Sequence, residues 1–399
     1  MSPDSWQRVR LEELVTVKHG FAFPGKHIHD QPVGDILLTP GNFAIGGGFR
    51  QDSFKYYDGP VPEGFVLTPG DLLVTMTDLS KTSDTLGFPA VVPSSDGQRY
   101  LHNQRLGKIE VESAALDSAY LYYRLRAHDY RHEVLASATG TTVKHTSPSR
   151  IARFAFDLPP IHEQRSIAAL LGALDDKIEL NRRMNETLER TIDVLFGQLL
   201  SASIGEPDVP IYDLAEVVYG AAFASAQFNG DGHGRPLIRI RDLASHEPDV
   251  FTDEAHPRAT VIRPGDIVVG MDGEFRAHIW RGRNAFLNQR VCTFVPGPAV
   301  PRAYVLKVIE APLAFFERAK TGTTVIHLGK ADIDRFRVRK PRRDALAEFG
   351  QATDPMVERI VGNAAESRTL AALRDALLPK LISGELRIHD AERATEQPT

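Results

Sequence analysis

Cysteine is nearly absent from this sequence of 399 residues, because Cys292 is the only one. A single thiol excludes a disulfide framework and any zinc site built on cysteines, and it is typical of a protein from a reducing compartment. Long apolar runs are also missing, and the first residues, MSPDSWQRVRLEELV, show no signal-peptide core. We therefore expect a cytoplasmic protein with no membrane contact.

The motifs of several enzyme classes are missing as well. The sequence has no Walker motif, nucleophile elbow or cluster of metal ligands. It also lacks the Asn-Pro-Pro-aromatic or Asp-Pro-Pro-aromatic motif that a DNA methyltransferase needs. The segment 230–234, GDGHG, resembles a glycine-rich nucleotide loop, but no strand-to-helix context surrounds it. We therefore expect no catalytic residues, no cofactor and no metal.

Positive charge is not in excess, since the net charge is −5. Nucleic-acid binding depends on a local patch rather than on the average, however. Segment 134–156 contains no acidic residue, and segment 318–343 is rich in Lys and Arg. Apolar residues make up 42% of the chain, enough for substantial cores. The composition is thus compatible with a basic surface on an acidic protein.

What the sequence does contain is a long internal duplication. Residues 139–164, TGTTVKHTSPSRIARFAFDLPPIHEQ, return in altered form as residues 321–342, TGTTVIHLGKADIDRFRVRKPR. Three earlier pairs match in the same order: LEELVTVKHGFAF with IYDLAEVVYGAAF, LTPGDLLVTMTD with IRPGDIVVGMDG, and LHNQR with LNQR. From Gly140 and Gly322 onward the offset stays at 182 residues. The matched motifs keep their order, and the offset between them changes only in loop-like intervals. This pattern indicates one folded unit used twice, and we expect pseudo-twofold symmetry.

Each repeat begins with a globular part of mixed α/β class. Pro-Gly turns precede the apolar runs DLLVTM and DIVVGM, as expected for strands. RFAFDL and RFRVRK alternate, which predicts that Phe154, Phe156, Phe336 and Val338 face inward. The stretches DSAYLYYRLRAHDYRHEVLAS and RAYVLKVIEAPLAFFERAK predict helices packed on the sheet. The strand order is not predictable from these patterns.

Each repeat ends in one long helix. The first follows Pro159-Pro160, and the second begins near Asp344, a good N-cap. A helix of about 38 residues is on the order of 57 Å long, which exceeds one turn of B-DNA at about 34–36 Å. Because a globular domain separates the two helices in sequence, we expect them to pair antiparallel. Ordinary core helices are the alternative.

The helices carry a heptad seam, with positions spaced alternately four and three residues apart. Polar residues in such a seam fix register and partner orientation at a cost in stability, and that is the expected role of Asn181, Asn185 and Asn363. The seam positions are Ile167, Leu171, Leu174, Ile178, Asn181, Asn185, Leu188, Ile192, Leu195 and Leu199 in the first helix, and Phe349, Thr353, Met356, Ile360, Asn363, Ser367, Leu370, Leu377 and Leu381 in the second.

The chain closely resembles the specificity subunit of type I restriction-modification systems. The resemblance covers nearly the whole chain and rests on PPIHEQRSIAALLGALDDKIELNRRMNETLE, ALRDALLPKLISGEL, the duplicated Gly-Thr-Thr element and the Pro-Gly-Asp strands. It implies two target-recognition domains, 1–160 and 204–342, and two coiled-coil helices, 161–203 and 343–384, with a flexible tail at 385–399. One departure is that the second helical region begins PRRDALAEFGQ rather than with Pro-Pro-x-x-Glu-Gln.

The resemblance also implies a function and partners. Each domain reads one half of a bipartite sequence in double-stranded DNA, and the coiled coil sets the unspecified spacer between the halves. The subunit performs no chemistry. It recruits two methyltransferase subunits, and through the complex the endonuclease/translocase subunits, in a methylation-based defence against phage.

The repeated element is a candidate for DNA contact. Gly-Thr-Thr turns offer backbone N–H groups and hydroxyls to phosphate, and nearby basic residues add charge. The alternatives are a solvated or capping histidine for each His and a solvated strand face for the arginines. The candidate DNA-binding residues are Thr141, Thr142, Lys144, His145, Arg150 and Arg153 in the first copy, and Thr323, Thr324, His327, Lys330, Arg335, Arg337 and Arg339 in the second.

Asn103-Gln104-Arg105 and Asn288-Gln289-Arg290 are of the types that pair with adenine and guanine. Residues shared by two domains that read different sequences suit fold support or backbone contacts better. Base-reading residues are expected where the copies differ, in residues 27–54, 77–99, 226–256 and 272–283.

Two other classes of protein are open alternatives. A stand-alone DNA-binding regulator would need no partner, and a related methylation-linked defence system would use the same scaffold with other catalytic subunits. The sequence specifies neither the DNA target, nor the spacer length, nor the methylated base.

Overall fold

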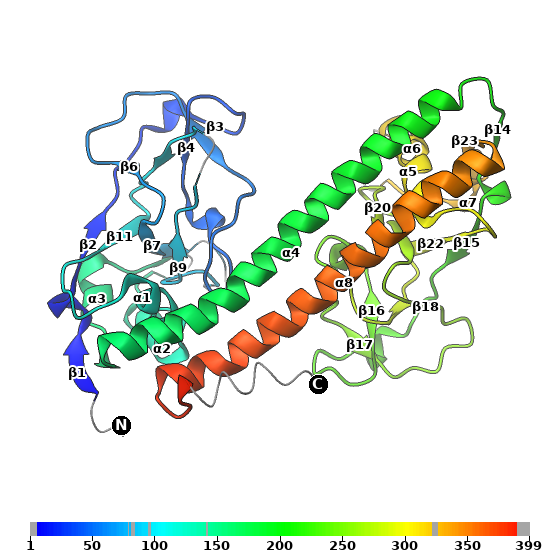
Figure 1. Ribbon diagram of the computed structural model, residues 1–399. Helices are drawn as coiled ribbons and strands as arrows, with labels where there is room; N and C mark the ends of the chain where they lie inside the picture. Colours follow the sequence, from blue (N-terminus) through cyan, green and yellow to red (C-terminus); the bar gives the residue numbers. More distant parts are fainter. Residues whose placement is uncertain are drawn as a thin grey trace. The chain divides into compact units, whose positions relative to one another are not determined.

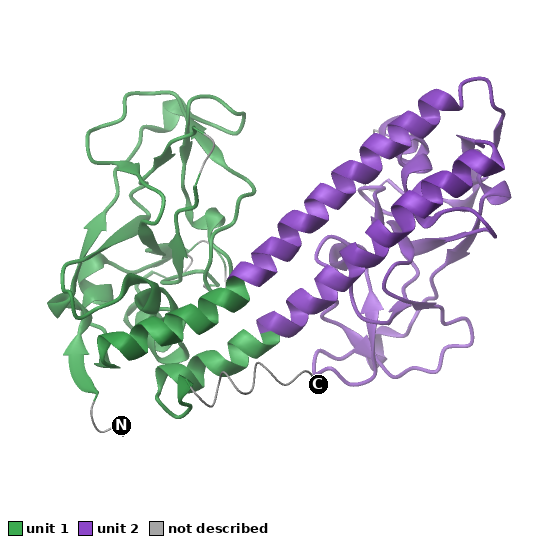
Figure 2. Cartoon of the chain, viewed as in Figure 1, with its two compact units in different colours: residues 1–175, 372–399 green, residues 176–371 purple. Residues whose placement is uncertain are grey.

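The structure is a computed structural model that describes residues 6–78, 80, 84–94, 97–140, 143–320 and 326–388. Its helices and most of its strands are labelled in Figure 1. The chain forms two compact units (Figure 2): residues 1–175 with 372–399, and residues 176–371. Each unit contains one globular repeat and a part of both long helices. The mixed α/β class, the two tandem globular repeats and the two long helices expected from the sequence are confirmed.

The first globular repeat contains thirteen strands and three α-helices among its described residues. Its strands are β1 (Gln7–Arg10), β2 (Val15–His19), β3 (Ile28–His29), β4 (Asp35–Leu37), β5 (Lys55–Tyr57), β6 (Val66–Leu67), β7 (Leu72–Thr75), β8 (Thr77–Asp78), β9 (Pro89–Val91), β10 (Tyr100–Leu101), β11 (Leu106–Val111), β12 (Lys144–His145) and β13 (Ala155–Leu158). Its helices are α1 (Ser118–Arg124), α2 (His128–Ser137) and α3 (Pro148–Ala152), with 3-10 turns η2 (Leu11–Glu13), η3 (Gly25–His27) and η4 (Pro40–Asn42).

The second globular repeat follows the same order of elements, except that isolated bridges replace the short strands β3, β8 and β12. Its strands are β14 (Asp208–Pro210), β15 (Ala215–Tyr219), β16 (Arg235–Ile238), β17 (Phe251–Thr252), β18 (Val261–Ile262), β19 (Ile267–Gly270), β20 (Ala277–Ile279), β21 (Ala285–Leu287), β22 (Val291–Pro296) and β23 (Arg337–Arg339). Its helices are α5 (Arg302–Val308), α6 (Glu310–Ala319) and α7 (Lys330–Ile333), with 3-10 turns η5 (Ile211–Asp213), η6 (Ser225–Gln227) and η7 (Ile240–Asp242).

The sheets of the two repeats share one topology. A four-stranded sheet has the order β2-β11-β7-β9 in the first repeat and β15-β22-β19-β20 in the second. A second sheet contains the order β5-β4-β10-β6 in one repeat and β17-β16-β21-β18 in the other, with β4–β10 and β16–β21 parallel. The strands that follow the Pro-Gly turns, β7 and β19, are buried along their whole length. These apolar runs therefore form inner strands of the four-stranded sheets.

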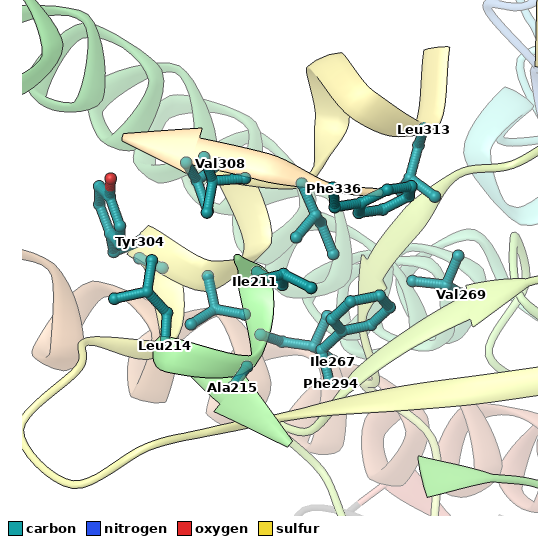
Figure 3. Packing of buried hydrophobic residues seen from close by; sticks show 14 of the residues in the cluster. Ile211, Leu214, Ala215, Ile267, Val269, Phe294, Tyr304, Val308, Leu313 and Phe336 are labelled. Carbon is teal, nitrogen blue, oxygen red and sulfur yellow. The ribbon is translucent and has the colours of Figure 1, made fainter. Parts of the chain in front are cut away.

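The core of the second repeat lies between its four-stranded sheet and the helices α5 and α6 (Figure 3). Ile267 and Phe294 come from the sheet, Val308 from α5 and Leu313 from α6. Phe336, just before β23, stacks on Phe316 with ring centroids 5.6 Å apart. The inward positions expected from the alternating run are confirmed, since Phe336 and Val338 are 1% and 3% exposed.

The two stretches expected to form helices each contain two. The first is interrupted between α1 and α2, because Ala127 adopts an extended conformation. Leu125 and Tyr130, one on each side of the break, are both fully buried. The second is divided at Ile309 between α5 and α6. The break lets each short helix direct its own apolar residues into the core.

The long helices α4 (Ile161–Ala202) and α8 (Arg343–Ile382) run antiparallel beside each other. In the second unit Asn181 Nδ2 donates to Glu366 Oε2 at 2.8 Å, and Asn185 Nδ2, one turn later in α4, donates to Ile360 O at 3.3 Å. In the first unit Arg374 Nη1 donates to Asp175 Oδ1 at 2.5 Å. As the residue number rises along α4, the number of its partner in α8 falls. This order confirms the antiparallel expectation.

The seam asparagines bond across this pair of helices. Asn363 Nδ2 donates to Asn185 Oδ1 at 2.8 Å, and both residues are buried. Asn181 is fully buried, and its amide holds the pKa of the Glu366 carboxyl below its usual value. The N–H groups of these amides find acceptors on the facing helix in one register, because a shift of either helix removes their partners, whereas the buried Asn181 Oδ1 has no hydrogen-bond partner among the described residues.

Replacing Asn363 with Ala is expected to destabilise the helix pair by about 1–3 kcal/mol, because Asn185 Oδ1 would remain buried without a donor. The double variant Asn185→Leu/Asn363→Leu removes both polar groups and is expected to cost less than the single change. Hydrogen exchange of the α4 and α8 amides measures both effects. A single variant no less stable than the double variant would contradict this role.

The two long helices start differently, as their sequences indicate. Gln164 is fully buried, where its Nε2 donates to Ala115 O and Pro159 O at 2.8 Å and its Oε1 accepts from Asp117 N at 2.9 Å. At the constant offset the second repeat has Leu346, which is buried in the apolar core. Gln164 of the Glu-Gln motif thus fixes the start of α4 to residues Ala115 and Asp117 of the globular repeat. The second repeat replaces these hydrogen bonds by the apolar packing of Leu346. The helix begins at Arg343, so Asp344 lies inside its first turn rather than at the N-cap.

Two further features complete the description. Among the described residues, no helix combines the length and the apolar character that crossing a bilayer requires. Of the expected tail 385–399, the structure describes residues 385–388, in which Arg387 Nη1 donates to Glu163 Oε1 at 3.1 Å. Residues 389–399 lie outside the described residues.

Candidate nucleic-acid interface

Three segments far apart in the sequence meet at one edge of the first globular repeat. Met76 N donates to Arg105 O at 2.8 Å, and Thr146 N donates to Met76 O at 2.9 Å. β8 pairs with β12, which places Thr77 opposite His145. We name Thr77, Asn103–Arg105 and His145 the first corner.

The second repeat builds the same arrangement from the equivalent residues. Met271 N donates to Arg290 O at 2.9 Å, and Leu328 N donates to Met271 O at 2.7 Å. Asp272 forms an antiparallel bridge with His327. Asp272, Asn288–Arg290 and His327 are the second corner. Equivalent backbone hydrogen bonds occur in both corners. The repeated motifs of the sequence therefore build the same structural element in each repeat.

A glycine lies against the Asn-Gln-Arg turn in each corner. A Cβ atom on Gly20 would lie 2.1 Å from Asn103 O, and one on Gly220 would lie 2.0 Å from Asn288 O. No side chain fits at such distances, so both positions require glycine. The backbone of the turn is therefore held by close packing, which favours the fold-support interpretation for its main chain.

The residues on either side of the Gly-Thr-Thr element of the first repeat pair with each other. Thr139 and His145 exchange backbone hydrogen bonds of 2.9 and 2.8 Å across it. Gly140 has a φ of 98°, and a Cβ there would lie 2.0 Å from Val143 O, so only glycine suits the turn. Thr141, Thr142, Thr323 and Thr324, all candidate DNA contacts, lie outside the described residues.

The histidines of the two corners have different partners. His145 Nδ1 and Thr77 Oγ1 are hydrogen-bonded at 3.2 Å. His327 Nδ1 donates to Asp272 Oδ1 at 2.6 Å, and Arg290 Nε lies 3.4 Å from Asp272 Oδ2. Both histidines are exposed. The second corner thus adds a carboxylate where the first has a hydroxyl.

A buried carboxylate organises the loop beside the first corner. Asp78 accepts hydrogen bonds from the backbone of Ser80, Thr85 and Leu86 at 2.6, 2.5 and 3.0 Å. Burial alone would raise the pKa of Asp78, but the hydrogen bonds from Ser80 and Thr85 outweigh it and lower the pKa below its usual value. Sequence reasoning singled out neither Asp78 nor the pair Thr77 and Asp272, although the alignment already set Thr77 against Asp272.

The basic candidates of the first repeat are only partly shared with the second. Lys144 is half-buried in β12, Arg150 Nη1 donates to Thr139 Oγ1 at 3.1 Å, and Arg153 is exposed after α3. At the constant offset Ile326 and Asp332 replace Lys144 and Arg150. Of these three, only Arg153 has a basic counterpart, which is Arg335.

The basic candidates of the second repeat lie outside the corner. Lys330 in α7 pairs with Asp334 at 2.7 Å, and the Arg335 guanidinium lies 5.3 Å from the centre of the Phe316 ring. Arg337 is exposed on β23, and its side chain has no hydrogen bond or ion pair to any described residue. The histidines therefore belong to the corners, whereas these cations lie on the following helix and strand.

Arg339 belongs to a cross-strand ion pair that both repeats contain with opposite polarity. In the second repeat Arg339 Nε donates to Asp208 Oδ1 at 2.8 Å across β14 and β23. In the first repeat Arg8 Nη1 donates to Asp157 Oδ2 at 3.4 Å across β1 and β13. The same strand position thus holds a cation in one copy and an anion in the other. This exchange favours a fold-supporting role for Arg339, because the ion pair connects the same two strands whichever strand carries the cation.

The comparisons with known proteins agree with the resemblance seen in the sequence. The family model for the type I restriction modification DNA specificity domain matches residues 3–190. The specificity subunit of the type I restriction enzyme EcoBI from Escherichia coli is 26% identical over 201 residues, which are 50% of this chain and 39% of that protein. The specificity subunit of MjaIX from Methanocaldococcus jannaschii is 22% identical over 302 residues, which are 68% of this chain and 70% of that protein.

A solved structure has the same fold along nearly the whole chain. The crystal structure of the S subunit of a type I restriction-modification system from M. genitalium aligns with a TM-score of 0.59 and 15% identity, covering 95% of this chain and 96% of that chain. At this identity the match establishes the architecture only. The resemblance inferred from the duplicated motifs is therefore confirmed: residues 3–190 match the model of the type I restriction modification DNA specificity domain, and the chain is similar to specificity subunits of type I restriction enzymes.

Proposed function

We propose that this chain is the DNA-recognition subunit of a type I restriction-modification complex, in which each globular repeat recognises one half of a bipartite DNA sequence. The observation that carries this proposal is the double occurrence of one corner in two repeats of the same topology. A shared framework with divergent surroundings suits two readers of different half-sites. The divergent residues 27–54, 77–99, 226–256 and 272–283 are the proposed base-reading segments.

In this proposal the helices α4 and α8 set the spacer and bind two methyltransferase subunits, which bring the endonuclease/translocase subunits into the complex. Leu180 and Val194 of α4 support a docking role, because they are 51% and 60% exposed although apolar. The chain itself performs no chemistry and acts in the cytoplasm, where its DNA substrate and its partners are present.

Mapping of methylated positions tests the proposal. The chain is co-expressed with its methyltransferase, and methylated bases are located by sequencing. We expect two short specified halves with an unspecified spacer, and no methylation from the chain alone. A continuous target, or methyl transfer by the purified chain without a partner, would contradict the proposal.

A change of helix length is expected to change the spacer alone. One heptad inserted after Asp175 in α4 and one after Ala371 in α8 adds about 10 Å to the helix pair, equivalent to roughly 3 base pairs at about 3.4 Å each. The same methylation assay should show both half-sites unchanged and the spacer lengthened. Altered half-sites with a constant spacer would refute the role assigned to the helices.

A further inference from the structure

We propose that the side chains of Gln104-Arg105 and Gln289-Arg290 form a sequence-independent anchor for the phosphate backbone of duplex DNA, one in each repeat. This inference rests on the proposed function, because it concerns how each repeat holds its half-site. It decides between fold support and DNA-backbone contact, the two roles that the sequence pattern favours for these residues over base reading.

The fold accounts for the main chain of the turn but not for these side chains. Asn103 Oδ1 accepts from Arg105 N at 3.2 Å, and Asn288 Oδ1 accepts from Gln289 N at 2.8 Å, so each Asn stabilises its own turn. By contrast, Gln104, Arg105 and Gln289 are exposed, and their side chains have no hydrogen bond or ion pair to any described residue. Arg290 is exposed too, with 54% of its side chain accessible.

Repetition distinguishes a phosphate contact from a base contact. A residue that selects a base must differ between domains that select different bases, whereas phosphates are the same at every position. Gln-Arg occupies the same place in both corners, as the matching hydrogen bonds of Met76 and Met271 to the two arginine carbonyls show. The same two side chains on the same backbone framework therefore fit the invariant part of the ligand.

The composition of each corner suits an anion. Arg carries donors in a planar fork that matches phosphate geometry, and the Gln amide adds neutral donors. Arg290 is oriented by Asp272, whose Oδ2 is 3.4 Å from its Nε, and by His327, whose Nδ1 is 3.5 Å from its Nη1, while 54% of its side chain stays accessible. In the first corner Thr77 replaces the carboxylate, so Arg105 keeps its full positive charge for the ligand.

Salt dependence of DNA binding tests the anchor. The chain in complex with its methyltransferase is titrated with a target duplex over a range of salt concentrations. Each of Arg105→Gln and Arg290→Gln is expected to reduce the slope of log K against log salt by about 0.9, because one phosphate contact is lost. The methylated sequence should stay the same. An unchanged slope in both variants would overturn the inference.

Conservative variants separate phosphate contact from base reading. Arg105→Lys and Arg290→Lys keep the charge but lose the bidentate fork, so a phosphate anchor retains its slope and its target. A changed base preference in either Lys variant would overturn the inference in favour of guanine reading. Because these side chains are exposed, all four variants should unfold like the wild type, which hydrogen exchange verifies.

The wild-type complex separates this inference from the proposed function. If it binds target and scrambled duplexes equally, the proposed function fails. If it prefers the target while both Gln variants keep the full slope, only the phosphate anchor fails.

Discussion

Replacing Asp175 with Ala is expected to destabilise the first unit by about 3 kcal/mol. Asp175 accepts hydrogen bonds from Tyr123 Oη at 2.9 Å, Arg126 Nη1 at 3.1 Å and Arg374 Nη1 at 2.5 Å. The carboxylate therefore ties the α1–α2 segment to both α4 and α8 within this unit. Its loss leaves two cations without their shared anion.

The size of the expected loss in stability follows from the burial of the two arginines that Asp175 binds. The Arg126 side chain is 5% exposed and that of Arg374 is 17% exposed, so water cannot replace the lost carboxylate fully. Burial would lower the pKa of Arg374, but its bonds to Asp175 and Asp375 outweigh this and raise it, so the carboxylates favour the charged form. Asp175 itself keeps 25% exposure, and for that reason we expect the lower end of the usual range.

Asp375 provides a matched control for this prediction. It bonds the same Arg374, with Nη2 2.7 Å from its Oδ1, but 61% of its side chain is exposed. Asp375→Ala should therefore cost about 0–1 kcal/mol. Hydrogen exchange of the α1 and α2 amides measures both variants in the first unit, and that of α5 and α6 serves as the internal reference. Equal losses from the two substitutions would refute the central role of Asp175.

Much of the architecture was predictable because the duplication is visible in the sequence. A constant offset of 182 residues aligns His145 with His327 and Asn181 with Asn363. The heptad positions placed Asn181, Asn185 and Asn363 in the seam, where the structure shows them bonded to the facing helix. Periodic patterns of this length depend on local geometry, which is why they predicted the helices well.

The corners were less predictable, because they depend on contacts between distant segments. Nothing local in Gly20 indicates that Asn103 O lies against it, since that contact forms only when the sheet is complete. The ion-pair role of Arg339 was hidden for the same reason. Its partner Asp208 is 131 residues away, and the run Arg335–Arg339 alone suggested a continuous basic face. The break at Ala127 likewise follows from burial on both of its sides rather than from a helix-breaking residue.

Replacing Gly220 with Ala is expected to destabilise the second unit by about 3 kcal/mol and to displace the second corner. The new Cβ would lie 2.0 Å from Asn288 O and 2.7 Å from Leu287 O, both backbone atoms that cannot rotate away. Relief of the clash requires the turn to move, which weakens the hydrogen bonds from Gly220 N to Val291 O and from Ala221 N to Leu287 O, each 3.0 Å long.

Gly197→Ala is the control, because the same chemical change there should have the opposite sign. Gly197 lies in α4 with no atom within 4 Å of the added Cβ, so Ala should stabilise the helix by up to about 1 kcal/mol. Hydrogen exchange of the β15 and β22 amides reports the loss at Gly220. Because Arg290 belongs to the displaced turn, Gly220→Ala should also weaken DNA binding. Gly20→Ala should destabilise the first unit in the same way and leave the second unit unchanged. If Gly220→Ala left the β15 and β22 amides as protected as in the wild type, the close approach of Gly220 and Asn288 would not define the corner, and the common framework of the two repeats would have to lie elsewhere.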